Sequence, residues 1–251
     1  MTTGSPRLEA QAQTEPQGPG RPRRRGLLPV LHADSVRRLR EGVFTAFREL
    51  CLRAEVRVTM LDAQALCCGA PWRAKGVTEG YEVMRRKVHA EIVMPDQLPI
   101  VTDASSCTRS LAEMARHWQV PVLDVVEFAA DELLPRLQVT TPLGSLALHP
   151  TCASTGLGIN EALLEVARFI CDDVEVPLSW ACCGFAGDRG LLHPELTESS
   201  SREMATEVNR REYDGYASVN RTCEIGMSQA TGRPYRHILE LLEEATRPVA
   251  G

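Results

Sequence analysis

The stretch SWACCGFAG, residues 179–187, is the one around which the chain is organised. It contains two adjacent cysteines, Cys182 and Cys183, which cannot pair with each other without strain. The glycine that follows them permits a sharp backbone turn. The same signature stands earlier in the chain, where Cys67 and Cys68 are followed by Gly-Ala-Pro-Trp. We therefore interpret the chain as two copies of one unit, each built around a cysteine pair that can reach a single inorganic centre.

Composition places the chain among globular proteins and excludes several functions. Its 251 residues can form one large domain or two of ordinary size. A net charge of −5 argues against nucleic acid as the main partner, and no apolar run approaches the roughly 20 residues of a membrane span.

The N-terminus lacks the apolar core of a secretory signal. Nine cysteines in such a chain indicate a reducing, cytoplasmic compartment, where clustered thiols bind metals or catalyse. Location in the cytoplasm or peripherally at the inner face of the membrane is expected.

Strands and helices alternate along the sequence. The pattern predicts strands over residues 26–31, 56–61, 100–103, 120–123, 145–149, 174–178 and 216–219. Helices are expected from residue 35 through the stretch that contains Cys51, over 81–94 and 108–118, from the fourth strand to residue 137, and over 160–170, 194–211 and 235–246. This order predicts an α/β fold of two tandem, similar, Rossmann-like units with parallel sheets. In such sheets ligands lie beyond the carboxyl ends of the strands, and the cysteine-bearing loops fall there.

The chain divides into three segments. Residues 1–26 are rich in Pro, Gly, Gln and Arg and are expected to be a disordered tail. Residues 27–139 form the first unit and residues 140–251 the second.

The cysteines of the two units are spaced alike, but the two sets are not equal. Cys67-Cys68 maps onto Cys182-Cys183 with an offset of 115, and Cys107 maps onto Cys223 with an offset of 116. The second unit adds a leading cysteine, Cys152. Projecting Cys152 back by 115 gives Arg37, so the first unit has an incomplete set. Either this unit has lost a ligand, or the chain starts downstream of its natural beginning.

Four cysteines can bind a [4Fe–4S] cluster or a tetrahedral zinc ion. Zinc sites usually use closely paired knuckles, whereas here Cys152, Cys182, Cys183 and Cys223 spread over 72 residues and three strand ends. This distribution favours one cluster in the second unit. Cys67, Cys68 and Cys107 alone make an incomplete site, so a second cluster is a weaker expectation.

Two further cysteines and two histidines are expected to have structural rather than metal-binding roles. Cys51 and Cys171 fall on the apolar faces of predicted helices and are expected in the core. His149, three residues before Cys152, could contact a cluster, but we favour a strand-end histidine satisfied by the backbone. His237 is expected to be packed. The sequence contains no Ser/His/Asp arrangement and no clear flavin or nicotinamide motif, so no catalytic or nucleotide-binding residue is predicted.

Several motifs resemble a known family. Tandem Cys-Cys-Gly units resemble the cysteine-rich domains of heterodisulfide reductases and of the iron–sulfur subunits of glycolate oxidase, lactate-utilisation and anaerobic glycerol-3-phosphate dehydrogenase systems. More specifically, residues 67–76, 222–227 and 231–237 look like the C-terminal iron–sulfur region of FAD-linked D-lactate dehydrogenases. The family's unit ends in C-x-x-C, whereas Ala104 and Asn220 stand at the first position of each pair here.

The resemblance implies an electron-transfer component of an oxidoreductase. FAD would lie on a partner dehydrogenase chain that oxidises a 2-hydroxy acid such as D-lactate or glycolate, and this chain would not be catalytic without that partner. Two alternatives remain open: a zinc-stabilised module that binds a partner, and a truncated remnant without electron-transfer activity. Stoichiometric zinc that is unchanged after anaerobic reconstitution would favour the zinc-stabilised module. A flavin subunit encoded in a neighbouring reading frame would argue against the truncated remnant.

Overall fold

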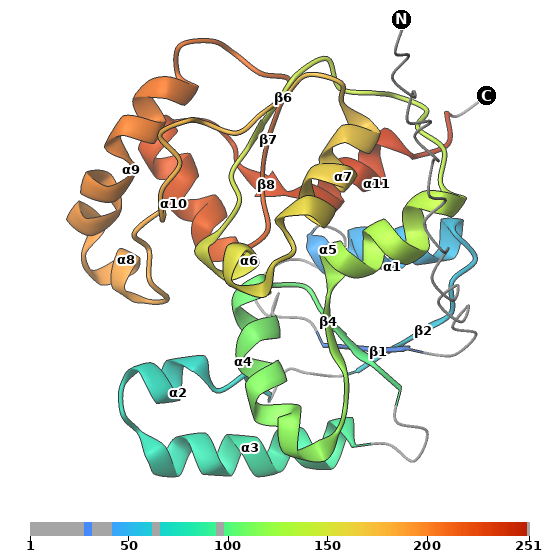
Figure 1. Ribbon diagram of the computed structural model, residues 1–251, viewed down its shortest axis with the longest axis vertical. Helices are drawn as coiled ribbons and strands as arrows, with labels where there is room; N and C mark the ends of the chain where they lie inside the picture. Colours follow the sequence, from blue (N-terminus) through green and yellow to red (C-terminus); the bar gives the residue numbers. More distant parts are fainter. Residues whose placement is uncertain (1–27, 32–41, 62–65, 94–97, 250–251) are drawn as a thin grey trace, which may run out of the picture.

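The computed structural model describes residues 28–31, 42–61, 66–93 and 98–249. The predicted tail and the projected position Arg37 lie outside these ranges. In the first half the elements follow the expected alternation of strand and helix (Figure 1). They are β1 (Leu28–Leu31), α1 (Val43–Arg53), β2 (Val58–Met60), α2 (Ala70–Ala74), α3 (Thr78–Ile92), β3 (Ile100–Thr102), α4 (Ser105–Ala115), β4 (Val122–Asp124) and α5 (Val125–Phe128). Helix α5 continues through a π-helical stretch and a final 3-10 turn to Arg136.

The second half repeats this alternation. Its elements are β5 (Leu146–Leu148), α6 (Cys152–Leu157), α7 (Asn160–Ile170), β6 (Val174–Glu175), α8 (Arg189–Leu192), α9 (Pro194–Val208), β7 (Gly215–Ser218), α10 (Arg221–Thr231), β8 (Arg236–His237) and α11 (Ile238–Ala245). Helix α7 has the bounds expected from its sequence pattern. Helices α6, α8 and α10 and strand β8 are additions, since the sequence pattern predicts none of them. Strand β8 occupies the start of the helix expected over 235–246, and α11 begins only at Ile238.

Each half forms a four-stranded parallel sheet. The strand order is β2-β1-β3-β4 in the first sheet and β6-β5-β7-β8 in the second, and every pairing is parallel. In chain order both sheets therefore read second, first, third, fourth. The predicted α/β fold with two similar parallel-sheet units is confirmed.

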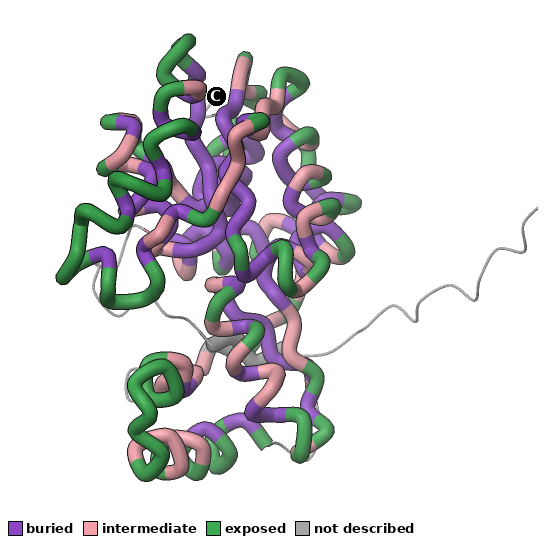
Figure 2. The backbone as a smooth tube through the Cα atoms, turned by 60° about the vertical axis from the view of Figure 1, so that its left-hand side comes forward, coloured by how far each residue is buried: buried purple, intermediate pink, exposed green. Residues whose placement is uncertain are grey.

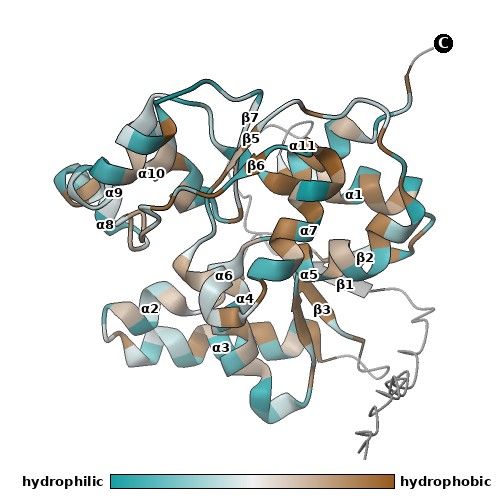
Figure 3. Ribbon diagram, turned by 45° about the horizontal axis from the view of Figure 1, so that its top comes forward, coloured by the Kyte–Doolittle hydropathy of each residue, from teal (hydrophilic) through white to brown (hydrophobic). Residues whose placement is uncertain are grey.

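Helices from the two halves pack together in a shared core. Figures 1 and 3 show α1, α5, α7 and α11 grouped on one side of the sheets. Phe47 of α1 and Leu242 of α11 are fully buried in the same apolar cluster. The ring of Phe47 also meets that of Phe128 edge-on, with centroids 5.6 Å apart. At the rim of this core Arg53 of α1 forms a 2.9 Å ion pair with Glu243 of α11. Burial of this apolar surface stabilises the two halves together.

The strands and the helices differ in exposure. Figure 2 shows the central strands buried and the outer helices exposed in part. Cys51 and Cys171 are 1% and 2% exposed, which confirms the prediction that they are core residues. Among the described residues no helix has the length and apolar character needed to cross a membrane.

Candidate metal centre

The four cysteines predicted as ligands in the second half come together at one end of its sheet. Cys152 is the first residue of α6, directly after β5, and Cys223 lies in the first turn of α10, directly after β7. Cys182 and Cys183 lie in the segment between β6 and α8. The Sγ atoms of Cys183 and Cys223 are 3.2 Å apart. Cys152 and Cys182 lie near this pair, since both raise the pKa of Cys223 through their charges.

The site has a buried side and an exposed side. Cys183 and Cys223 are 3% and 5% exposed, whereas Cys152 and Cys182 are open to solvent. The sequence predicts that Cys152 and Cys223 lie in loops, but both lie in the first turn of a helix. Their position past the ends of the strands is as expected. The first turn of a helix presents free backbone N–H groups, which favour thiolates there.

Side-chain hydrogen bonds hold the Cys182-Cys183 segment in place. The indole of Trp180 donates a 2.6 Å hydrogen bond to the carbonyl of Pro150, which ties the segment to the end of β5. On α9, the hydroxyls of Ser200 and Ser201 donate to the carbonyls of Cys182 and Cys183 at 2.5 and 3.2 Å. These three bonds fix both thiols relative to β5 and α9.

Only glycine fits at position 184, because the Cys182-Cys183 segment packs closely against α9 there. Its φ is +71°, a left-handed conformation that residues with a Cβ rarely adopt. A Cβ at this position would lie 2.8 Å from the carbonyl oxygen of Leu196 and 2.7 Å from Cβ of Ser200. The Cys-Cys-Gly signature is therefore explained by a turn that presses against α9.

The buried pair of thiols titrates unequally. The hydrogen bond with Cys223 and, to a smaller extent, the neighbouring His149 lower the pKa of Cys183 to about 5, against the opposing effect of burial. The same hydrogen bond and burial raise the pKa of Cys223 well above its ordinary value. Burial and the charge of Cys182 raise the pKa of Cys152. Within the buried pair, Cys183 is therefore the thiol that ionises more readily, and thiolate is the form that binds metals.

His149 lies beside the buried pair, and the prediction that the backbone satisfies its ring is wrong. The side chain is 1% exposed, and neither ring nitrogen has a hydrogen-bond partner within the described part of the chain. One ring nitrogen and the Sγ atoms of Cys183 and Cys223 all lie within 4.8 Å of one another. The backbone N–H and carbonyl of His149 are hydrogen-bonded to Ala217 and Ser218 of β7. Its ring lies beside the two thiols and has no hydrogen-bond partner among the described residues. His237 behaves as predicted: it is buried, and its Nδ1 accepts a hydrogen bond from the backbone N–H of Leu239.

The first half also brings its three cysteines near one another. Cys67 and Cys68 precede α2, and Cys107 lies in the first turn of α4. Hydrogen bonding with Cys68 raises the pKa of Cys67, and hydrogen bonding with Cys107 raises that of Cys68 to about 11. All three thiols are partly buried. Gly69 again has a positive φ, +82°, and packs against the ring of Tyr81.

Strand register identifies the position that corresponds to Cys152. Val30 pairs with Val101 in the first sheet, and Leu148 pairs with Ala217 in the second. The offset of 116 that relates Cys107 to Cys223 also relates Val101 to Ala217, so Val30 corresponds to Leu148. The counterpart of Cys152 is then Asp34 rather than Arg37. Both positions lie outside the described residues, and neither is a cysteine.

Asn220, which stands where the family's unit has a cysteine, links the two halves. Its side chain is 3% exposed. Its carbonyl oxygen accepts a 3.1 Å hydrogen bond from the backbone N–H of Ser106 in α4. Its amide donates to the hydroxyl of Thr151 at 3.3 Å. Thr151 in turn caps α6, which carries Cys152. Sequence reasoning treated Asn220 only as a departure from the family pattern and missed this role.

The residues present fit a metal centre. They offer four thiols and one imidazole, and the imidazole lacks any other partner among the described residues. Two thiolates on one tetrahedral zinc ion lie about 3.8 Å apart, given a Zn–S distance of about 2.3 Å. The 3.2 Å separation of Cys183 and Cys223 is shorter than that value, so the two sulfurs must also move slightly apart to bind one zinc ion. A four-iron cluster is wider, so the two sulfurs must move apart to bind separate irons.

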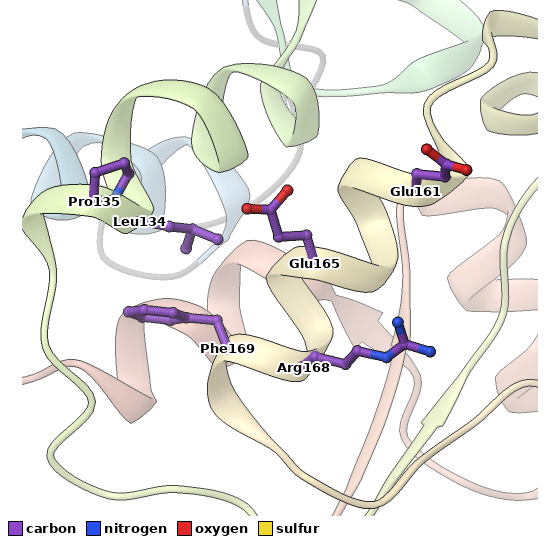
Figure 4. A pocket seen from close by; sticks show the side chains of 6 residues that line it. All are labelled: Leu134, Pro135, Glu161, Glu165, Arg168 and Phe169. Carbon is purple, nitrogen blue, oxygen red and sulfur yellow. The ribbon is translucent and has the colours of Figure 1, made fainter. Parts of the chain in front are cut away.

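A surface hollow lies between α7 and the 3-10 turn that ends the helical stretch after α5 (Figure 4). It has a volume of about 530 Å³ and is lined by Leu134, Pro135, Glu161, Glu165, Arg168 and Phe169. No thiol or histidine contributes to its lining. It is therefore not part of the candidate metal centre.

Two curated proteins are similar in sequence. Lactate utilization protein A of Oceanobacillus iheyensis is 26% identical over 217 residues, which cover 77% of this chain and 87% of that protein. The glycolate oxidase iron-sulfur subunit of Escherichia coli K12 is 26% identical over 139 residues, which cover 53% of this chain and 33% of that subunit. Among solved structures, an aspartate racemase of Picrophilus torridus aligns over 88% of this chain and 92% of its own, with 12% identity and a TM-score of 0.35. That structural likeness is too low to support any conclusion.

A family model for the cysteine-rich domain matches residues 34–112 and again residues 146–228. The two matches cover more than half of the chain and fall one in each half. Each contains a Cys-Cys-Gly signature and the trailing cysteine that follows it. The chain therefore belongs to the CCG cysteine-rich domain family, with two copies of the domain.

Proposed function

We propose that this protein is the iron–sulfur electron-transfer component of a flavin-dependent system that oxidises a 2-hydroxy acid. The observation that carries the proposal is the convergence of four cysteines, from three separate segments, on one end of the second sheet. Similarity to lactate utilization protein A and to the glycolate oxidase iron-sulfur subunit supports it. The proposed ligands are Cys152, Cys182, Cys183 and Cys223, and the proposed cofactor is one [4Fe–4S] cluster.

The residues of this site have different roles in binding a cluster. When bound, an iron–sulfur cluster supplies one-electron transfer. Cys183 and Cys223 provide buried ligation from the core side, whereas Cys152 and Cys182 form the solvent side. Trp180, Ser200 and Ser201 hold the ligand backbone and thereby limit rearrangement between oxidation states. The exposed side is the one from which an electron donor can approach.

The finer parts of the proposal rest on the resemblance. The flavin, FAD, is assigned to a partner dehydrogenase chain, and the substrate class to D-lactate or glycolate. The resemblance of residues 67–76, 222–227 and 231–237 to FAD-linked D-lactate dehydrogenases supports this assignment. The protein is proposed to act in the cytoplasm, free or peripherally at the inner face of the membrane. Cys67, Cys68 and Cys107 are proposed as the incomplete counterpart of the main site.

A zinc-stabilised, partner-binding module is the second candidate. It is favoured by the compact group of His149, Cys183 and Cys223, whose ligand atoms lie within 4.8 Å of one another. Such a spacing suits a single ion with nitrogen and sulfur ligands.

Metal analysis of anaerobically purified protein separates the two candidates. The cluster proposal predicts iron and acid-labile sulfide in equal amounts, with broad visible absorbance. Stoichiometric zinc that persists after anaerobic reconstitution with iron and sulfide would favour the second candidate. The flavin partner is tested by reducing the reconstituted protein with a purified flavin dehydrogenase and its 2-hydroxy acid. Failure of reduction with every such pair, despite a bound cluster, would contradict that part of the proposal.

A further inference from the structure

His149 is a buried polar side chain for which the described protein provides no partner. Its backbone N–H donates to the carbonyl of Ala217 at 2.8 Å, and its carbonyl accepts from the hydroxyl of Ser218 at 2.9 Å. These two bonds fix the residue at the end of β5. Neither ring nitrogen has a hydrogen-bond partner in the part of the chain that the structure describes. A buried imidazole carries at least one N–H group, and leaving it unpaired is unfavourable.

Two thiol sulfurs beside the ring could accept this N–H. The Sγ atoms of Cys183 and Cys223 lie within 4.8 Å of the same ring nitrogen and of each other. A thiolate sulfur is an acceptor, and it can approach the ring once the two thiols separate to bind a metal centre. His237 differs in its neighbours. It is equally buried at the end of β8, and its Nε2 also lacks a partner among the described residues, but its Nδ1 caps α11 and it is not part of the group with Cys183 and Cys223.

We propose that His149 donates a ring N–H hydrogen bond to a ligand sulfur of the buried pair, Cys183 and Cys223, and thereby sets the reduction potential of the metal centre. His149 is then a positioning residue, and all four cysteines remain the ligands. Hydrogen bonds to sulfur withdraw electron density and raise the potential of iron–sulfur centres. The inference rests on the proposed cluster.

Two variants at this one position form a matched pair. His149→Gln keeps an N–H donor. His149→Leu removes the donor and fills the same buried position with an apolar side chain of similar size. With anaerobically reconstituted protein, the midpoint potential of His149→Leu is expected to shift to a more negative value, and that of His149→Gln to stay closer to wild type. Equal potentials for wild type and His149→Leu would overturn the proposal.

A second measurement covers the case in which a variant does not hold the cluster. Wild-type protein with ¹⁵N in its histidine rings alone is studied by pulsed EPR of the reduced cluster. A weak coupling to histidine nitrogen is expected, as for a hydrogen-bond donor. No coupling overturns the proposal, and a strong coupling, as from a direct iron ligand, also overturns it. Wild-type protein that binds no cluster contradicts the proposed function itself, so the two failures are distinguishable.

Discussion

The Sγ atoms of Cys183 and Cys223 lie 3.2 Å apart although 40 residues separate them in sequence. They come from different elements, since Cys183 precedes α8 and Cys223 lies in the first turn of α10. The strand order of the second sheet, in which β5 lies between β6 and β7, brings these elements to one edge. Their contact is the structural basis for treating the four cysteines as one centre.

Replacing Cys183 separates its role from that of a core cysteine. Cys183→Ser is expected to lose most of the bound metal, because serine does not replace the buried thiolate. Cys51→Ser is the control: it buries a hydroxyl in the core, which costs about 1–3 kcal/mol of stability, but leaves the metal content unchanged. Metal content and the free energy of unfolding of both variants check this. Equal metal content in wild type and Cys183→Ser would contradict the assignment.

Gly184 and Gly158 offer a matched test of the turn after the cysteine pair. Both have positive φ, +71° and +74°, so an alanine at either site costs about 1–2 kcal/mol for the left-handed backbone. A Cβ at Gly158 meets nothing within 4 Å, whereas one at Gly184 would clash with Leu196 and Ser200. Gly184→Ala is therefore expected to be the more destabilising change and to reduce metal content. Equal effects of the two substitutions on unfolding and metal content would show that the contact with α9 is unimportant.

Asn220 is expected to contribute to stability through its link between the halves. Asn220→Ala leaves the backbone N–H of Ser106 and the hydroxyl of Thr151 without this partner, at a cost of about 1–3 kcal/mol. Asn209→Ala is a control within the second half alone, where the amide donates to the carbonyl of Thr231. Chemical denaturation of both variants measures the difference. A cost for Asn220→Ala no larger than that for Asn209→Ala would argue against the link.

Asp124 predicts a pH dependence of stability. It is 1% exposed at the end of β4, and burial raises its pKa from 3.8 to about 6, in spite of hydrogen bonds from Val126 and Thr108. A raised folded-state pKa means that the contribution to stability is fully present below pH 3.8 and is lost as pH rises through 6. The shift of about 2 pKa units corresponds to about 3 kcal/mol.

The comparison with Asp124→Asn isolates this effect, because asparagine stays neutral and can still cap α5. The stability of wild type relative to Asp124→Asn should fall by up to about 3 kcal/mol between pH 4 and pH 7. Denaturation curves at several pH values measure it. A difference that is flat or rises over that range would refute the raised pKa of the buried Asp124 carboxyl.

The parts of the fold that follow from local pattern were predictable from sequence. Helix α7 has the expected bounds because its apolar residues recur at helical spacing and face the core. The cysteines stand past the strand ends because parallel strands direct their loops to one edge. Helix α10 was missed since Gly226 interrupts its pattern. The structure gives a reason for this glycine, as a Cβ there would lie 3.3 Å from Phe185 and Thr197.

The rest depended on tertiary contacts that the sequence does not reveal. Strand β8 is two residues long and exists because Arg236 and His237 pair with Ala217 and Ser218. Whether a buried histidine is satisfied depends on which atoms surround it, so His149 and His237 could not be told apart in sequence. The bridging role of Asn220 requires the two halves to be packed together. Sequence therefore predicted which cysteines to examine and named His149 as a residue that could contact a cluster. The structure showed that its ring lacks a backbone partner among the described residues and added Asn220.

The central claim is that the four cysteines of the second half bind an iron–sulfur cluster. The most direct test is the iron, sulfide and zinc content of the wild-type chain, purified and reconstituted under anaerobic conditions. The account predicts about four irons and about four sulfides per chain, with broad visible absorbance that is lost in Cys183→Ser. Protein without iron and sulfide, or with one tightly bound zinc ion in their place, would contradict it.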